Sequence, residues 1–182
     1  MATQFARIEP QHRAFIERQR IFFVASAAAD SRVNLSPKGL DALRVLDDRS
    51  VCYLDLTGSG SETSAHLLAD GRLTIMFCAF EGPPNILRLY GHGRSLVRGT
   101  SDYAEMLAAR YGGVETPGAR AIIVLDCDLV QTSCGFAVPL FDYKDDRPTL
   151  VRWAEQKGED GVAAYRRDKN AESMDGLPTG LL

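Results

Sequence analysis

Residues that could hold an anion occur first in the stretch 32–39 (RVNLSPKG), where Lys38 stands between Pro37 and Gly39. Because proline cannot donate a hydrogen bond to a sheet, we expect strand pairing to stop at Pro37 and Lys38 to point away from the sheet. Gly39 permits a backbone conformation that other residues avoid. A lysine on a broken strand is one way to place a positive charge beside a phosphate.

A Gly/Ser-rich loop, 57–61, and the helix expected after it form the second candidate anion site. Ser59 and Glu62 have the spacing of a capping box, which predicts a helix with its N-cap at Ser59 that runs to about residue 70. The unpaired main-chain N–H groups of a first helical turn bind anions. Further donors would be the hydroxyls of Ser61, Thr63 and Ser64. The two features together predict a bound phosphate, while a loop whose Gly and Ser residues only make a turn and a cap is the alternative.

The elements that position these residues alternate irregularly along the chain. We expect helices at 10–19, 59–70, 101–111, 149–157 and 159–168, and strands at 21–29, 33–36, 40–46, 51–56, 72–80, 86–98 and 120–132. Strands with helices inserted between them indicate an α+β fold. Gly91 and Gly93 within one long strand predict a bend or bulge, as a small barrel requires. The prediction is therefore one domain over residues 1–182, a six- to seven-stranded antiparallel barrel with helices packed around it and a helical extension at about 149–182.

Composition excludes several classes of protein. The chain has 182 residues and a net charge of −3, which argues against a nucleic-acid partner. It contains no apolar run near the roughly 20 residues that span a bilayer and no secretory signal, so we expect no membrane partner and a cytoplasmic location. The four cysteines lack metal-site spacing, so no metal is expected. Cys134 alone lies in a predicted loop, as either a reactive or an inert thiol.

Four segments in order resemble the pyridoxamine 5′-phosphate oxidase-like family, the FMN-binding split barrels. They are RVNLSPKG (32–39), YLDLTGSGSETSAHL (53–67), RLTIMFCAF (72–80) and ILRLYGHGR (86–94). The segments QTSCGFAVPLFDY (131–143) and DGLPTGLL (175–182) are similar to one uncharacterised branch of that family. The resemblance covers nearly the whole chain and implies a split β-barrel that forms a homodimer, with FMN bound at the subunit interface.

The resemblance also implies where FMN would lie. Lys38 falls at the position of a lysine near the flavin and the substrate, and Leu54 and Asp55 fall on the strand beside the ring. Thr63 and Ser64 stand where the oxidase itself has an Arg-Lys pair on the phosphate. Because two hydroxyls replace two cations here, another positive charge must meet the phosphate.

That charge could come from Arg32, Lys38 or Arg88, and whether Arg32 or Val33 takes the first basic position of the family stays open. No catalytic residue is assigned. The predicted cofactor-binding residues are Arg32, Asn34, Ser36, Pro37, Lys38, Leu54, Asp55, Ser61, Thr63, Ser64 and Arg88.

The function that the resemblance implies is an FMN-dependent oxidoreductase that acts on a small molecule by hydride or electron transfer. The Arg-Leu-x-Pro ending of the vitamin B6 enzyme is absent, which separates this chain from that enzyme. Two alternatives stand beside this prediction. One is a flavin-binding or storage protein without turnover, and the other is the same barrel with the deazaflavin F420 or haem as its cofactor.

Overall fold

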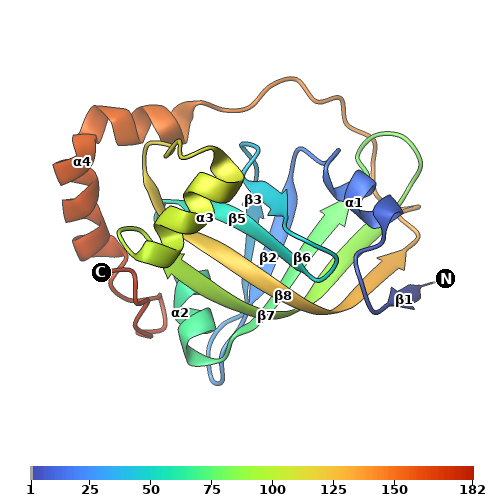
Figure 1. Cartoon of the computed structure of the whole chain (residues 1–182), viewed down its shortest axis with the longest axis horizontal. Coiled ribbons are helices and arrows are strands. Elements are labelled where there is room, and N and C mark those ends of the chain that lie inside the picture. The colour runs from blue at the N-terminus through green and yellow to red at the C-terminus, as the bar shows by residue number, and fades with distance from the viewer. Residues whose placement is uncertain (1) are drawn as a thin grey trace.

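The computed structural model describes residues 2–182 of the chain. Its strands are β1 (Thr3–Phe5), β2 (Phe22–Ser26), β3 (Asn34–Lys38), β4 (Leu43–Val45), β5 (Ser50–Leu56), β6 (Arg72–Cys78), β7 (Ile86–Val97) and β8 (Ala119–Ser133). Its helices are α1 (Pro10–Ile16), α2 (Glu62–Ala69), α3 (Ser101–Tyr111) and α4 (Thr149–Lys169), as Figure 1 shows.

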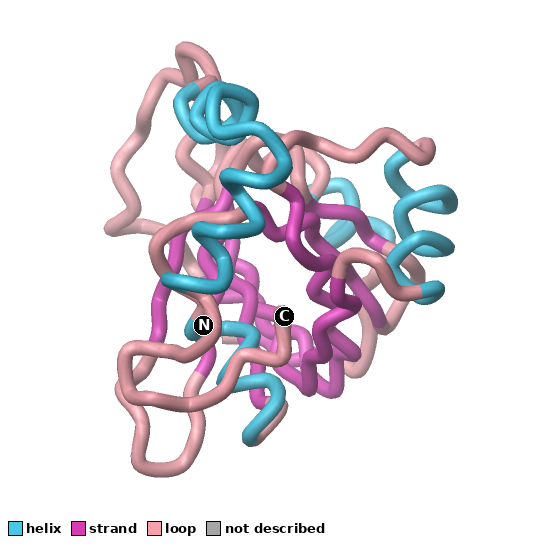
Figure 2. The backbone as a smooth tube through the Cα atoms, turned by 90° about the vertical axis from the view of Figure 1, so that its left-hand side faces the viewer, coloured by secondary structure: helices cyan, strands magenta, loops and turns pink. Residues whose placement is uncertain are grey.

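Seven of the strands form one antiparallel sheet in the order β3-β2-β6-β7-β8-β5-β4, and the short β1 pairs with β8. The sheet curls around its own interior with the helices outside it (Figure 2). Since β3 and β4 are its two edges, the barrel is split between them. The predicted α+β split barrel is confirmed. The three residues of β1 were not predicted, because so short a segment carries no periodic signal.

The interior of the barrel is filled by apolar side chains from the middle of the sheet. Val24, Ile75 and Leu89 are fully buried there. The register of β7 and β8 shifts between Tyr90 and Gly91, which confirms the predicted bulge. A Cβ atom on Gly91 would lie 2.0 Å from a main-chain oxygen of β8, so only glycine fits this close approach.

The predicted break in pairing at Pro37 is wrong. Pro37 lies opposite Phe23, and the ladder between β2 and β3 continues to Lys38, which lies opposite Phe22. The physical reason is that β3 is an edge strand. One side of its backbone has no partner strand, and proline is tolerated where its nitrogen faces that open side.

The C-terminal part of the chain lies outside the barrel. A connecting segment of residues 134–148 runs from β8 across the molecule to α4 (Figure 1). Helix α4 is kinked at Gly158, where φ is 65°, so the prediction of two short helices matches its two halves. None of the helices within residues 2–182 has the length and apolar character needed to cross a membrane.

Candidate functional site

Strand β3 places a row of polar side chains on the inside of the barrel. Ser36 lies opposite Val24, and Lys38 lies opposite Phe22. Residues that lie opposite each other in an antiparallel ladder share a face, and both Val24 and Phe22 belong to the core. Lys38 therefore points into the barrel and not away from the sheet as predicted. The inward row is Asn34, Ser36 and Lys38.

A buried carboxylate fixes the lysine of this row. Lys38 Nζ lies 2.8 Å from one oxygen of Asp55 on β5, and Arg120 Nε lies 2.7 Å from the other. The side chain of Asp55 is 3% exposed and that of Arg120 is 4% exposed. Burial alone would raise the pKa of Asp55, but the charges and hydrogen bonds of Lys38 and Arg120 outweigh it and hold that pKa at about 2. Asp55 is therefore an anion held between two cations.

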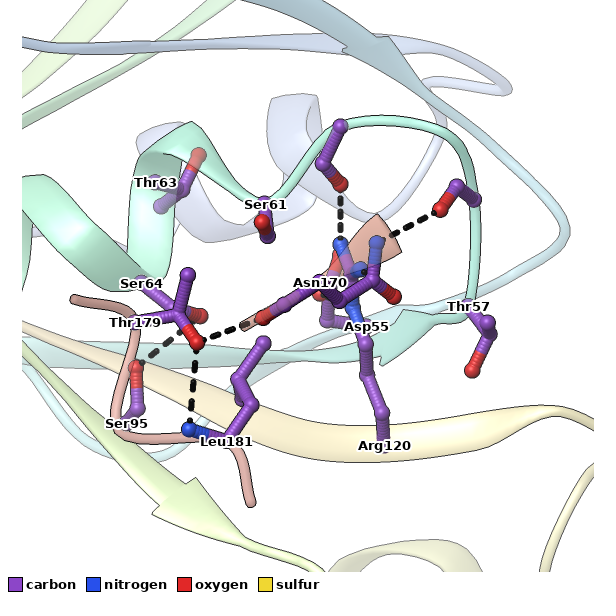
Figure 3. A network of polar contacts seen from close by, with 12 residues as sticks. Asp55, Thr57, Ser61, Thr63, Ser64, Ser95, Arg120, Asn170, Thr179 and Leu181 are labelled. Atoms are coloured by element: carbon purple, nitrogen blue, oxygen red, sulfur yellow. Dashed lines mark hydrogen bonds and ion pairs between the residues drawn. The ribbon is translucent and has the colours of Figure 1, made fainter. Parts of the chain in front are cut away.

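The same arginine holds the Gly/Ser loop in place. Arg120 donates from Nη2 to the carbonyl of Gly60 at 2.8 Å and from Nη1 to Asn170 Oδ1 at 2.9 Å. Asn170, which follows α4, donates in turn to the carbonyl of Gly58 at 3.1 Å. Figure 3 shows this network converging beneath the loop. The loop conformation therefore depends on β8 and on the C-terminal segment.

Helix α2 begins two residues later than predicted, at an N-cap of Ser61 whose side chain makes no capping hydrogen bond. The expected capping box of Ser59 and Glu62 is wrong. The carboxylate of Glu62 instead accepts a hydrogen bond from the amide of Met174 at 3.4 Å, and the hydroxyl of Ser61 donates to the carbonyl of Glu172 at 3.4 Å. The first-turn amides of α2 therefore donate no hydrogen bond to the side chain of the N-cap residue.

The two predicted anion sites meet through one amide side chain. Asn34 Nδ2 donates to Thr63 Oγ1 on α2 at 3.0 Å and to Ser26 Oγ at 3.2 Å. Ser26 also lies 3.0 Å from Nδ1 of the buried His66, which belongs to α2. Strand β3 is therefore tied to the first turns of α2 by hydrogen bonds, as the hypothesis of a shared anion site requires.

A cavity of about 880 Å³ lies where these elements meet, and we call it the cofactor cavity after the ligand that the sequence predicts for these residues. Seven of the predicted site residues line it, namely Asn34, Ser36, Pro37, Lys38, Leu54, Ser61 and Thr63. On the side of α4, the wall contains Trp153 and Tyr165, whose ring centroids lie 5.0 Å apart. Arg120 reaches the cavity from β8.

Four predicted residues do not line this cavity. Asp55 stands behind Lys38, and Ser64 is buried, where it lies 3.4 Å from the hydroxyl of Ser95. Arg32 pairs with Asp175 of the C-terminal segment. Arg88 lies between the core residues of β7 and therefore faces the outside of the sheet, where it donates to Ser133 at 3.2 Å.

Arg120, Asn170, Trp153 and Tyr165 were not predicted as site residues. Arg120 carried one local signal, because it is a charged residue near the start of an otherwise apolar strand, and such residues are seldom buried without a partner. Nothing near Asn170 in the sequence indicates its role.

Comparison with known proteins assigns a family to this arrangement. A sequence model described as "Pyridoxamine 5′-phosphate oxidase" matches residues 8–134. The pyridoxamine 5′-phosphate oxidase family protein ustO of Aspergillus flavus is 42% identical over 179 residues, which cover 88% of this chain and 71% of that protein.

Two solved structures share the fold. HupZ from Group A Streptococcus has a TM-score of 0.56 and 20% identity, over 69% of this chain and 99% of that chain. A Lactobacillus delbrueckii protein, named as a candidate pyridoxamine 5′-phosphate oxidase, has a TM-score of 0.53 and 17% identity, over 69% of this chain and 94% of that chain. At this level of identity the likeness concerns the fold alone.

Proposed function

Because this chain belongs to the pyridoxamine 5′-phosphate oxidase family, we propose that it is an FMN-dependent oxidoreductase acting on a small molecule. The observation that carries the proposal is the cofactor cavity, into which Ser36 and Lys38 of β3 and Thr63 of α2 all project. Its volume of about 880 Å³ lies within the range of roughly 300–1,000 Å³ typical of small-molecule and cofactor sites.

The phosphate of FMN fits the start of α2. A helix N-terminus without a side-chain cap leaves main-chain donors free, and its dipole favours negative charge. Ser61 and Thr63 line the cavity at this point and add hydroxyl groups. The carboxylate of Glu62, the one acidic group in the first turn, is engaged by the amide of Met174. These groups can replace the two cations that the oxidase itself uses.

The wall of the cofactor cavity opposite the start of α2 carries a net positive charge. Lys38 and Arg120 share the single carboxylate of Asp55, so these three groups carry a net charge of one unit. Bound FMN would supply the hydride or electron transfer. The part played by the chain is to hold the lysine charge at the cavity wall, where it favours an anionic ligand.

We also propose a homodimer with its cofactor sites at the subunit interface. Opposite the inward row, Leu35 and Pro37 of β3 lie on the outer face of the sheet, next to Phe23 of β2. Leu35 is 64% exposed, and Phe23 is only partly buried. An apolar outer face on an edge strand is a favourable surface for a second copy, because such patches on soluble proteins commonly mark interaction sites.

A cytoplasmic location is the third part of the proposal. All four cysteines are free thiols, and Cys52 and Cys78 are buried in the fold. Free, buried thiols are the usual state in a reducing compartment.

An absorbance spectrum of the purified protein, recorded with and without added FMN, tests the proposal. Flavin bands that stay with the protein and bleach with NAD(P)H would support an oxidoreductase. Bands that do not respond to any donor would instead support flavin storage. A Soret band after adding haem would favour the haem alternative, although none of the three histidines, all within the described chain, lines the cofactor cavity.

A further inference from the structure

A chain of hydrogen bonds inside the barrel joins the cofactor cavity to a buried histidine. His66 of α2 is fully buried, and its Nδ1 lies 3.0 Å from the hydroxyl oxygen of Ser26. Asn34 connects Ser26 to two hydroxyl groups that line the cofactor cavity, those of Thr63 and Ser36. Such a chain has a direction, because each hydroxyl group can donate only one proton.

The amide of Asn34 sets the direction at the cavity. Its two N–H groups donate to Ser26 Oγ at 3.2 Å and to Thr63 Oγ1 at 3.0 Å. Its carbonyl oxygen accepts a hydrogen bond from Ser36 Oγ at 2.9 Å. Both donors of the amide are therefore in use, and Asn34 has no donor left for a ligand.

The two hydroxyl groups at the cavity are consequently left in opposite states. Thr63 accepts from Asn34 and donates to none of residues 2–182, so its proton is available to a ligand. Tyr53 does not compete for this proton, because its buried hydroxyl has no hydrogen-bond partner in the described chain. Ser36 has already given its proton to Asn34, so only its lone pairs can face a ligand. A donor at Thr63 suits an anion, and an acceptor at Ser36 suits an O–H or N–H group.

The other end of the chain accounts for His66. Ser26 is buried and accepts from Asn34, and His66 Nδ1 is the one acceptor that its own proton meets among the described residues. The imidazole then carries its proton on Nε2, which has no hydrogen-bond partner within residues 2–182. Leaving a buried N–H unsatisfied is unfavourable, and the hydrogen bond at Nδ1 offsets part of that cost.

We propose that Asn34 and His66 are positioning residues that give the cofactor cavity a fixed polarity. Because the proton of Ser26 goes to His66, Ser26 can only accept from Asn34. The second N–H of Asn34 is then directed at Thr63, whose own proton is free for the anionic group of a ligand. Asn34 thus acts through Thr63 and donates nothing to the ligand itself. That the anion is the phosphate of FMN rests on the proposed function, whereas the direction of the chain does not.

Nitrogen-15 NMR of the full-length protein, recorded with and without FMN, identifies the tautomer of His66. The chain has three histidines, and the signals of His12 and His92 are assigned by replacing each with glutamine. We expect the proton of His66 on Nε2 in both spectra. A proton on Nδ1 would reverse the direction of the chain and overturn the proposal.

Flavin titrations of variants test the role of Asn34, with riboflavin as the comparison ligand because it lacks only the phosphate. Thr63→Val should raise the dissociation constant of FMN about tenfold, as the loss of one charged hydrogen bond does, and leave that of riboflavin unchanged. Asn34→Leu should reduce the preference for FMN over riboflavin by a similar factor. The double variant should lose no more of this preference than either single variant, because Asn34 acts through Thr63.

Matched controls separate positioning from a general loss of structure, which would weaken both flavins equally. Thr74→Val removes a hydroxyl group from β6 that does not line the cofactor cavity, so both dissociation constants should stay as in the wild type. His66→Asn keeps a side-chain acceptor near the position of Nδ1, whereas His66→Leu keeps none. Only His66→Leu should therefore reduce the preference for FMN, by about threefold.

The outcomes separate this proposal from the flavin proposal. If the effects of Asn34→Leu and Thr63→Val add, or if Thr63→Val weakens both flavins alike, the proposed polarity is wrong. If neither flavin binds the wild type, the flavin function is removed. The tautomer of His66 then decides the polarity alone, and it also decides if Asn34→Leu does not fold.

Discussion

Lys38 Nζ lies 2.8 Å from Asp55 Oδ1, and this ion pair joins the edge strand β3 to β5 across the split in the barrel. No strand pairing connects β3 with β4 or β5 in the described sheet, so the contact is made by side chains. Arg120 holds the other oxygen of Asp55 and at the same time holds the Gly/Ser loop. One buried carboxylate thus links the lysine of the site to the loop that leads into α2.

The first prediction concerns the stability of this link. Asp55→Asn leaves Arg120 buried without a counter-charge, and losing one partner of a buried ion pair is strongly destabilising. We expect the free energy of unfolding to fall by about 3 kcal/mol, measured by urea denaturation. Asp126→Asn is the control, because Asp126 pairs with Arg94 at the surface and is 61% exposed. Equal changes in the two variants would contradict the role given to Asp55.

The second prediction concerns pH. The pKa of Asp55 is about 2 in the folded protein, below its ordinary value of 3.8. The unfolded chain therefore binds a proton first as pH falls. The stabilisation, about 2 kcal/mol, is complete above roughly pH 4 and is lost as pH falls toward 2. Urea midpoints measured from pH 6 to pH 2 should fall more steeply for the wild type than for Asp55→Asn, and parallel curves would refute the assignment.

Local pattern was enough to predict three of the helices and every described strand except β1, because period and turn signals act over a few residues. It was not enough for the network around Asp55. Arg120 lies 65 positions away from Asp55 in the chain, and only the β5–β8 register brings them together. The prediction that α2 starts at Ser59 was wrong for a related reason. Long-range bonds from Arg120 and Asn170 fix the loop, so the local preference for a cap at Ser59 is overridden.

Arg88 shows a different limit. It was expected as one of three cations that could meet the phosphate charge, but Leu87 and Leu89 face the core, and Arg88 between them faces outward. Successive residues of a strand alternate between faces, so an error of one position reverses the assignment. On β3, the same alternation places Asn34, Ser36 and Lys38 on one face, and all three line the cofactor cavity. Which of the alternating residues of a strand point into the barrel can be decided only when the buried face of the strand is known.

The third prediction concerns cofactor binding. Lys38→Ala removes the charge at the cavity wall, and we expect the dissociation constant of FMN to rise about tenfold, measured by flavin fluorescence quenching. Lys169→Ala is the control, because Lys169 is 58% exposed and pairs with the adjacent Asp168. Thermal unfolding recorded on both variants shows whether the fold is kept. An unchanged FMN affinity in a folded Lys38→Ala protein would remove this residue from the site.

The fourth prediction concerns assembly. Leu35→Asp puts a charge on the outer face of β3, and burying that charge in an apolar interface is costly. If this face joins two copies, the variant should sediment as a monomer at concentrations where the wild type is a dimer, and it should retain less FMN. Val114→Asp is the control, since Val114 is an apolar residue that is 73% exposed on the loop after α3 and does not belong to β3. A Leu35→Asp protein that remains as dimeric as the Val114→Asp protein would show that copies associate through another surface, and the cofactor cavity would then have to be complete within one chain.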